Sequence, residues 1–139
     1  MQKLYFYDTG LACSLVRIEN QQQLSTYYQK GELFENLVIN EFIKQRYNHG
    51  KINNLYFWRN NHGNEIDCLI SQFETDMVVE IKLGATYSTS FFLNINYWNK
   101  LSKGTAKDSY VVYTGDKTLK TKLGMLISWK EMDKLLALI

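Results

Sequence analysis

Three stretches in the middle of the chain either alternate between apolar and polar positions or are rich in aromatic residues. Leu55–Arg59 is aromatic, and both Glu65–Ser71 and residues 77–82 follow a period of two. This spacing predicts three strands. Residues 60–63, with the sequence Asn-Asn-His-Gly, predict a turn between the first two strands.

Longer stretches with apolar residues three or four positions apart predict helices on both sides of these strands. The clearest helix covers residues 31–47 and ends at residues 48–50, whose Asn-His-Gly sequence tolerates left-handed backbone geometry. The glutamine-rich residues 19–30 are predicted to form a loop. Three further helices are predicted at residues 11–18, where Asp8-Thr9-Gly10 offers an N-cap, and at residues 89–103 and 129–138.

Short β-rich runs complete the pattern at residues 3–7, 110–113 and 125–128. Helical and strand-like stretches therefore alternate along the chain. This order predicts an α/β fold, with a mixed central sheet flanked by helices and a single domain over residues 1–139.

The composition narrows the class of protein. Of the 139 residues, 45% are hydrophobic and 22% are charged, which is typical of globular domains and not of disordered chains. No apolar run approaches the roughly 18 residues of a membrane span, so we expect a soluble protein with no membrane partner. Cys13 and Cys68 fit no metal-binding spacing and lie in apolar patterns, so we expect buried, reduced thiols in a cytoplasmic protein.

The net charge of +2 is too small to indicate a nucleic-acid partner by itself. Residues 100–122 nevertheless hold six lysines and only two aspartates. This stretch could contact phosphates, although a basic surface region is more often simply solvated.

Charged residues that could carry chemistry lie on the second and third predicted strands. Strict alternation would place Glu65 and Asp67 on one face, together with Glu80 and Lys82 of the next strand, and leave the other face wholly apolar. Clustered carboxylates repel one another, and a bound cation relieves that repulsion. Oxygen ligands suit Mg²⁺ or Mn²⁺. The alternatives are a solvated face of alternating charges and a purely structural ion-pair network.

Glu35 adds a carboxylate from the long predicted helix. At about 100° per residue, Val38, Ile39 and Phe42 all lie within roughly 60° of it, so Glu35 sits in the middle of an apolar stripe. A charge there is costly unless it is paired or binds a ligand. Stabilisation of a first-turn acid by the helix dipole is the alternative, and it explains Glu32 better than Glu35.

Four motifs occur in order along the chain: Gly31-Glu32-Leu33-Phe34-Glu35-Asn36, Tyr56-Phe57-Trp58-Arg59, Asn64-Glu65-Ile66-Asp67 and Val79-Glu80-Ile81-Lys82. With the opening Lys3-Leu4-Tyr5-Phe6-Tyr7-Asp8-Thr9-Gly10-Leu11, this set resembles the C-terminal domain of unknown function that follows AAA-type ATPase modules in bacteria and archaea. That domain is assigned to the PD-(D/E)xK, restriction-endonuclease-like superfamily. The resemblance spans nearly the whole chain and implies a restriction-endonuclease-like core. The proline of the superfamily's name is absent, and Glu-Ile-Asp stands in its place.

The resemblance implies a role for each matching residue. Asp67 and Glu80 would bind Mg²⁺ or Mn²⁺, together with the backbone carbonyl of Ile81. Lys82 would act on the attacking water and the phosphate. Glu35 would complete the site from the helix, and Glu65 would be an auxiliary acid.

The function implied is a divalent-metal-dependent nuclease domain that hydrolyses the phosphodiester bonds of DNA or RNA. The resemblance further implies that the chain is the C-terminal part of a longer protein with an ATPase domain upstream. The alternative is a catalytically inactive module of the same fold that binds nucleic acid or another protein, and a homo-oligomer is left open.

Overall fold

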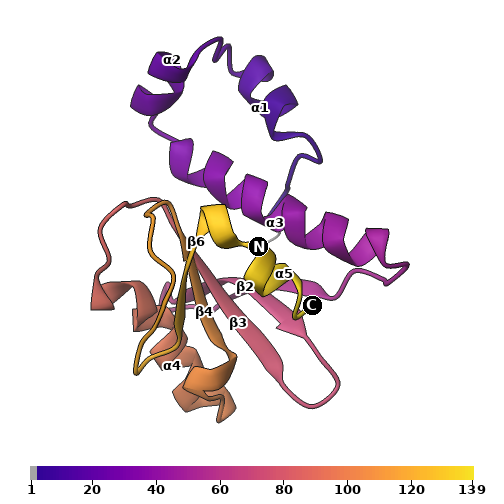
Figure 1. The fold of residues 1–139 in the computed structure, drawn as a ribbon, viewed down its shortest axis with the longest axis vertical. Helices are drawn as coiled ribbons and strands as arrows, with labels where there is room; N and C mark the ends of the chain where they lie inside the picture. Colours follow the sequence, from indigo (N-terminus) through magenta and orange to yellow (C-terminus); the bar gives the residue numbers. More distant parts are fainter. Residues whose placement is uncertain (1–2) are drawn as a thin grey trace.

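A computed structural model describes residues 3–139 and contains a six-stranded sheet between layers of helices (Figure 1). The strand order is β1-β2-β3-β4-β6-β5. The strands are Leu55–Arg59 (β1), Glu65–Ser71 (β2), Asp76–Lys82 (β3), Ser109–Tyr113 (β4), Leu119–Lys120 (β5) and Met125–Ser128 (β6). The predicted α/β class is confirmed.

The sheet is mixed, as predicted, and its strand direction changes at β3. β1, β2 and β3 pair antiparallel, whereas β3 pairs parallel with β4, and β4 pairs parallel with β6. The short β5, which the sequence pattern did not predict, pairs antiparallel with β6. β3 therefore lies between a meander on one side and a parallel crossover on the other.

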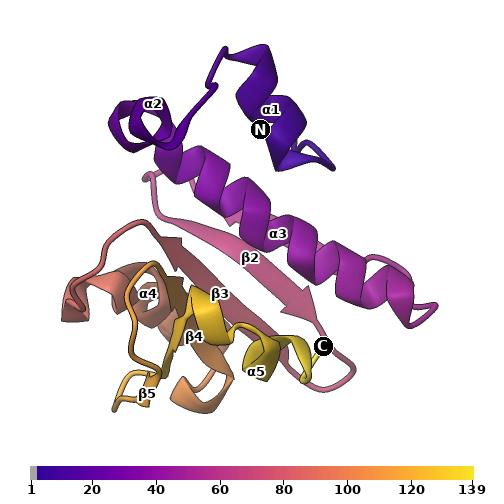
Figure 2. The same ribbon diagram turned by 45° about the horizontal axis from the view of Figure 1, so that its top comes forward.

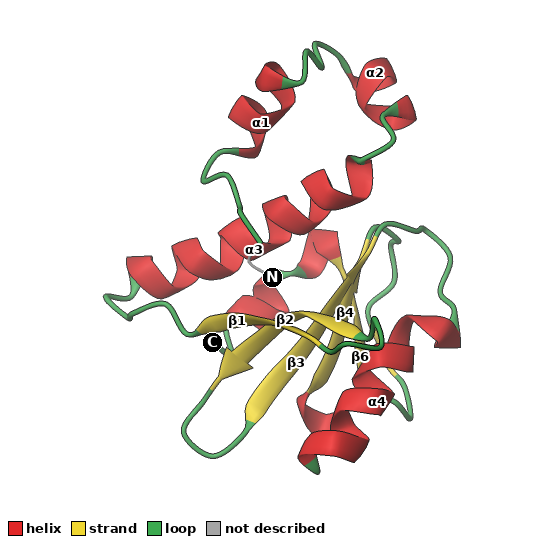
Figure 3. Ribbon diagram, turned by 180° about the vertical axis from the view of Figure 1, so that it is seen from behind, coloured by secondary structure: helices red, strands yellow, loops and turns green. Residues whose placement is uncertain are grey.

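Helices cover both faces of this sheet (Figures 2 and 3). One face packs against α3 and α5 through a core that includes Val38, Phe42 and Leu135. The other packs against α4 through Ile95 and against the 3₁₀ turn before α4 through Phe92. The α-helices are Thr9–Leu15 (α1), Gln21–Thr26 (α2), Lys30–Asn48 (α3), Leu93–Ser102 (α4) and Asp133–Leu136 (α5), and 3₁₀ turns occur at Thr89–Phe92, Ala106–Asp108 and Trp129–Glu131.

The elements with clear periodicity were predicted within one or two residues. β1, β2 and β6 have the predicted bounds or lie within them, and α3 extends one residue beyond the prediction at each end. Between β1 and β2, Gly63 has a positive φ of 85°, and the Asn60 side chain accepts hydrogen bonds from the His62 and Asn64 amides. The two predicted helices at 89–103 and 129–138 each begin as a 3₁₀ turn.

The predicted alternation of β2 is wrong in the middle of the strand. Tyr56 pairs with Leu69 and Trp58 pairs with Ile66, so Asp67 and Cys68 together face the single residue Phe57 of β1. This bulge shifts the phase of the strand. As a result Ile66 packs on the α4 side, with Leu69, and Cys68 packs on the α3 side. Neither face is a solvated one, because both are apolar and covered.

The predicted strand at residues 3–7 does not form. The backbone of Phe6 is bound instead by amide side chains of α3: its N–H donates to Asn36 Oδ1 at 2.7 Å, and its carbonyl accepts from Asn36 Nδ2 and Asn40 Nδ2. Both asparagines are buried. The segment is therefore attached to the helix and not to the sheet, and its polar backbone groups are satisfied without a strand partner.

The polar stretch 19–30 is not wholly a loop, because it contains α2. Asn20 caps this helix by accepting from the Gln23 amide, and the Gln23 side chain accepts from the Glu19 amide. α1 and α2 stand away from the sheet (Figure 1), and the segment from residue 4 to residue 28 exposes a series of large apolar side chains. They are Leu4, Phe6, Tyr7, Leu11, Leu15, Val16, Leu24 and Tyr28.

Within residues 3–139, no helix combines the length and the apolar composition that a membrane crossing requires. Cys68 is buried, as predicted, and burial raises the pKa of its thiol. Cys13 is only partly buried, because α1 contacts α3 with one side and leaves the other open.

We expect an Asn36→Ala variant to lose about 1–3 kcal/mol of unfolding free energy, because the Phe6 amide and carbonyl lose their partner in a partly buried place. Urea unfolding would measure this loss, and limited proteolysis should cut within residues 3–29 faster than in the wild type. Lys44→Ala, which removes an exposed ion pair from the same helix, is the control and should change little. Unchanged stability and proteolysis of Asn36→Ala would contradict this account of the N-terminal segment.

Candidate functional site

The predicted site residues lie at the end of the sheet where β3 finishes. β2 begins there with Glu65, and β3 ends there with Lys82, because the two strands are antiparallel neighbours. The N-terminal half of α3 brings Glu35 to the same place, and the segment before α1 brings Lys3. We call Glu35, Glu65, Asp67 and Glu80 the acid cluster.

Asp67 occupies the bulge of β2. The register of the β2–β3 pair, if continued beyond Cys68 and Val79, places Asp67 opposite Glu80. At this point the Asp67 side chain serves as the hydrogen-bond acceptor in place of a backbone carbonyl, since its Oδ2 accepts a hydrogen bond from the Ile81 amide at 2.8 Å. Burial raises the pKa of Asp67, although the Lys82 charge and the Ile81 amide act against that rise. The bulge therefore aims a carboxylate at the end of β3.

Glu80 is the most buried member of the acid cluster, with 1% of its side chain exposed. Its Oε2 is bound by the Lys82 ammonium, whereas its Oε1 is buried and has no hydrogen-bond partner of good geometry among the described residues. The Asn94 side chain interacts with this carboxylate only weakly. Burial and the Asp67 charge raise the pKa of Glu80 to about 7, against the opposing effects of Lys82 and Asn94. A buried carboxylate oxygen without a partner is costly, so this residue reduces the stability of the domain.

Lys82 connects Glu80 to Asp67. Its Nζ lies 3.8 Å from Asp67 Oδ2 and is hydrogen-bonded to Glu80. Burial alone would lower the pKa of Lys82, but the charges of Glu80 and Asp67 outweigh that effect and raise it. The ammonium group is therefore a firmly charged neighbour of both carboxylates.

A second ammonium group, that of Lys3, enters the acid cluster from the other side. Lys3 Nζ lies 2.9 Å from Glu35 Oε1, and it lies 3.7 Å from Glu65 Oε1 and 4.0 Å from Asp67 Oδ1. Glu35 also accepts a 2.6 Å hydrogen bond from the Tyr5 hydroxyl. Burial and this hydrogen bond raise the pKa of Tyr5. Glu35 is thus a paired and largely buried acid.

The structure brings all the predicted side chains together, but in two linked groups. Asp67, Glu80 and Lys82 form one, and Glu35 and Glu65 join Asp67 through Lys3. The side chain of Ile81 packs into the core on the α3 side and its amide binds Asp67, so the role predicted for its carbonyl stays a prediction. Lys3 and Tyr5, which both bind Glu35, were not predicted from the sequence.

The acid cluster has the donor chemistry of a hard divalent cation. It offers carboxylate oxygens, including the unpartnered Glu80 Oε1, and no thiol or imidazole ligand is among its members. No three His, Cys, Asp or Glu side chains of residues 3–139 converge closely enough to form a ready-made metal site. The carboxylates instead turn toward the two ammonium groups. The ligand type of these residues therefore fits Mg²⁺ or Mn²⁺. To bind such a cation, the carboxylates would have to move toward one another and away from the ammonium groups.

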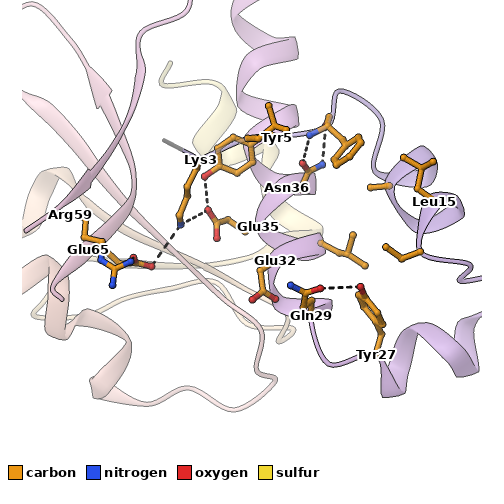
Figure 4. A pocket seen from close by; sticks show the side chains of 15 residues that line it. Lys3, Tyr5, Leu15, Tyr27, Gln29, Glu32, Glu35, Asn36, Arg59 and Glu65 are labelled. Atoms are coloured by element: carbon orange, nitrogen blue, oxygen red, sulfur yellow. Dashed lines mark hydrogen bonds and ion pairs between the residues drawn. The ribbon is translucent and has the colours of Figure 1, made fainter. Parts of the chain in front are cut away.

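A cavity of about 490 Å³ opens beside the acid cluster, between the N-terminal segment, α3 and the end of β1 (Figure 4). Charged side chains of Lys3, Glu32, Glu35, Arg59 and Glu65 line the end next to the sheet. The other end is mixed, with Leu15 and Tyr27 beside the polar side chain of Gln29. The cluster is therefore reached from a cavity and is not enclosed.

Within residues 3–139, no lysine of the stretch 100–122 forms an ion pair with the acid cluster. All six of its lysines are exposed. Those before β4 lie at the opposite end of the sheet, because Ser109 pairs with Val78 and Tyr113 pairs with Lys82. Whether the stretch contacts phosphates stays a prediction.

Residues 30–132 match the family described as Domain of unknown function (DUF4143). No curated protein and no solved structure matches the chain. The matched range contains the whole acid cluster and Lys82, whereas Lys3, Tyr5, α1 and α2 precede it.

Proposed function

The chain belongs to the DUF4143 domain family, and from that membership and the geometry of the acid cluster we propose that the domain is a divalent-metal-dependent nuclease that hydrolyses nucleic-acid phosphodiesters. The observation that carries this proposal is Glu80, a buried carboxylate next to Asp67 with one oxygen that has no hydrogen-bond partner among residues 3–139. An acid kept in a place where it costs stability is typical of functional sites.

In the proposed reaction Asp67 and Glu80 would hold Mg²⁺ or Mn²⁺, with the Ile81 carbonyl and Glu35 as further ligands. The metal, when bound, would polarise the phosphate and lower the pKa of the attacking water. The Lys82 ammonium, which stays charged beside both acids, would stabilise the negative charge that develops on the phosphate. Glu65 would assist as an auxiliary acid at the mouth of the site.

Partners follow from the same proposal. The nucleic acid would approach through the cavity beside the acid cluster. The resemblance to domains that follow AAA-type ATPase modules supports a tethered ATPase domain as a second partner. Two cysteines that form no disulfide with each other are consistent with a cytoplasmic location, which belongs to the proposal as well.

Isothermal titration of Mn²⁺ and Mg²⁺ into the domain tests the metal site. We expect saturable binding by the wild type and a loss of more than about 100-fold in affinity for Asp67→Ala. Glu74→Ala, an exposed acid of the β2–β3 turn, is the matched control and should bind as the wild type does. Asp67→Ala also removes the hydrogen-bond acceptor of the Ile81 amide, which could destabilise the fold. Circular dichroism would therefore be used to check that the variant is folded. No saturable binding at millimolar metal would overturn the proposal.

A second candidate function is a non-catalytic module that binds nucleic acid or protein. One observation favours it: the Lys82 ammonium is bound by Glu80 and lies 3.8 Å from Asp67 in this structure, so it is not free for the catalytic role that a nuclease requires. Fluorescence anisotropy with labelled single- and double-stranded oligonucleotides, run beside a cleavage assay in Mn²⁺, separates the two functions. Binding without cleavage under all conditions would favour the module.

A further inference from the structure

Among the described residues, Lys3 is the cation that pairs with the acid cluster and precedes the family-matched part of the chain. Its side chain is 19% exposed, and its ammonium group is within 4.0 Å of three different carboxylates. It also lies 4.3 Å from the centre of the Phe57 ring. Lys3 is therefore not a freely mobile surface lysine, because the aromatic ring and the carboxylates together fix the position of its ammonium group.

The position of Lys3 conflicts with a bound divalent cation. Asp67 Oδ2 is engaged by the Ile81 amide and Lys82, which leaves Oδ1 as the oxygen that can turn to a further cation. That oxygen is the one that faces Lys3. A doubly charged ion bound to Asp67 would repel an ammonium group a few ångström away, so the two cations compete for the same acids.

Lys3 is the cation that can leave. Lys82 is on β3, which is paired on both sides, and it is bonded to the buried Glu80. Lys3 lies on a segment with no helix or strand, three residues before the Phe6 anchor. Its long side chain also borders the 490 Å³ cavity, and Glu32 lines the same cavity (Figure 4). A displaced ammonium group therefore has both room and a carboxylate to move toward.

We propose that Lys3 is a built-in counter-ion of the acid cluster, and that its insertion and the binding of a divalent metal exclude each other. This inference rests on the proposed metal site and adds a control element to it. Because linkage is reciprocal, metal binding displaces the Lys3 ammonium group from the acids, and anything that holds Lys3 in place weakens metal binding. The segment before α1 thereby becomes a device that regulates the site.

Mn²⁺ titration of the wild type, Lys3→Met and Lys3→Arg tests the competition. We expect Lys3→Met to bind Mn²⁺ at least about tenfold more tightly than the wild type, because it keeps the length of the side chain and loses the charge. Lys3→Arg keeps the charge and is expected to bind as the wild type does.

A second readout follows Lys3 itself. The reactivity of individual lysines toward an amine-acylating reagent can be measured by peptide mass spectrometry with and without Mn²⁺. We expect Mn²⁺ to increase the labelling of Lys3 and to leave Lys44, an exposed lysine of α3, unchanged.

The outcomes separate this inference from the proposed function. Equal Mn²⁺ affinity in all three proteins, with unchanged labelling of Lys3, would overturn the competition and leave the metal site standing. Tighter binding by Lys3→Met, without a change in the labelling of Lys3 in the wild type, would indicate a long-range charge effect. That result would also overturn the competition. No binding by any of the three proteins would overturn the proposed function and this inference together.

Discussion

A Glu80→Gln domain is expected to be more stable than the wild type at pH 8 and to bind Mn²⁺ far more weakly. In the folded domain the pKa of Glu80 is raised from 4.5 to about 7. The folded state therefore keeps a proton on Glu80 between these pH values, whereas the unfolded chain has released it. Stability consequently falls as the pH rises through this window, by up to about 3 kcal/mol. Glutamine stays neutral and avoids that loss.

Urea unfolding of the wild type and Glu80→Gln at several values between pH 4.5 and pH 8 would measure the effect. We expect the two curves to separate as the pH rises, with the variant above the wild type. Glu74→Gln, in the exposed β2–β3 turn, should follow the wild type. If the acids formed only a structural ion-pair network, Glu80→Gln would be the less stable protein at pH 8, because Lys82 would lose its bonded partner. The sign of the difference therefore distinguishes a functional acid from a structural one.

Lys82→Met is expected to lower phosphodiester cleavage by about 100-fold or more, the effect of removing one group that stabilises charge in a transition state. It should also cost about 2 kcal/mol of stability, because Glu80 Oε2 loses its ammonium partner. The loss is limited because Glu80, with its raised pKa, can take up a proton instead of remaining an unpaired charge.

Cleavage of labelled single- and double-stranded DNA and RNA in Mn²⁺ would measure the first effect, and thermal unfolding the second. Lys100→Met, an exposed lysine of α4, is the control for both. Mn²⁺ affinity should not decrease in Lys82→Met, because the change removes a positive charge from the cluster. Cleavage at the wild-type rate by Lys82→Met would contradict the role proposed for this lysine, whatever happened to stability.

Much of the fold could be predicted from the sequence because its elements repeat with a clear period. α3 repeats apolar residues at intervals of three or four positions, and β2 and β3 contain several β-branched residues. Glu35 could be singled out for the same reason, since a regular helix defines its buried side, and Glu35 is largely buried and paired in the structure. A prediction from periodicity fails where the strand is irregular, as it is at the Asp67 bulge. Nothing local marks this bulge, because Asp67 has an apolar residue on each side.

The N-terminal region was harder to predict for two different reasons. α2 had a usable signal, since Asn20 and Gln23 have the spacing of a helix cap and its return partner, but its glutamine-rich composition concealed the helix. Lys3 had no local signal at all. Its partners are 32 or more residues away, and the segment is anchored by asparagine side chains of α3. The attachment of residues 3–7 to a helix by side-chain hydrogen bonds leaves no trace in the pattern of apolar residues.

The change of strand direction at β3 has a consequence for how the domain assembles. α3, β1, β2 and β3 follow one another in the chain with short links, whereas β4 joins β3 only after the α4 crossover. Short loops close with the smallest loss of chain entropy. Every carboxylate of the acid cluster, and Lys82, lies on this first, contiguous unit, and none lies on β4, β5 or β6. Local opening of the β5–β6 edge would therefore leave the acids assembled, and the later half of the sheet is free to vary in sequence without rebuilding the site.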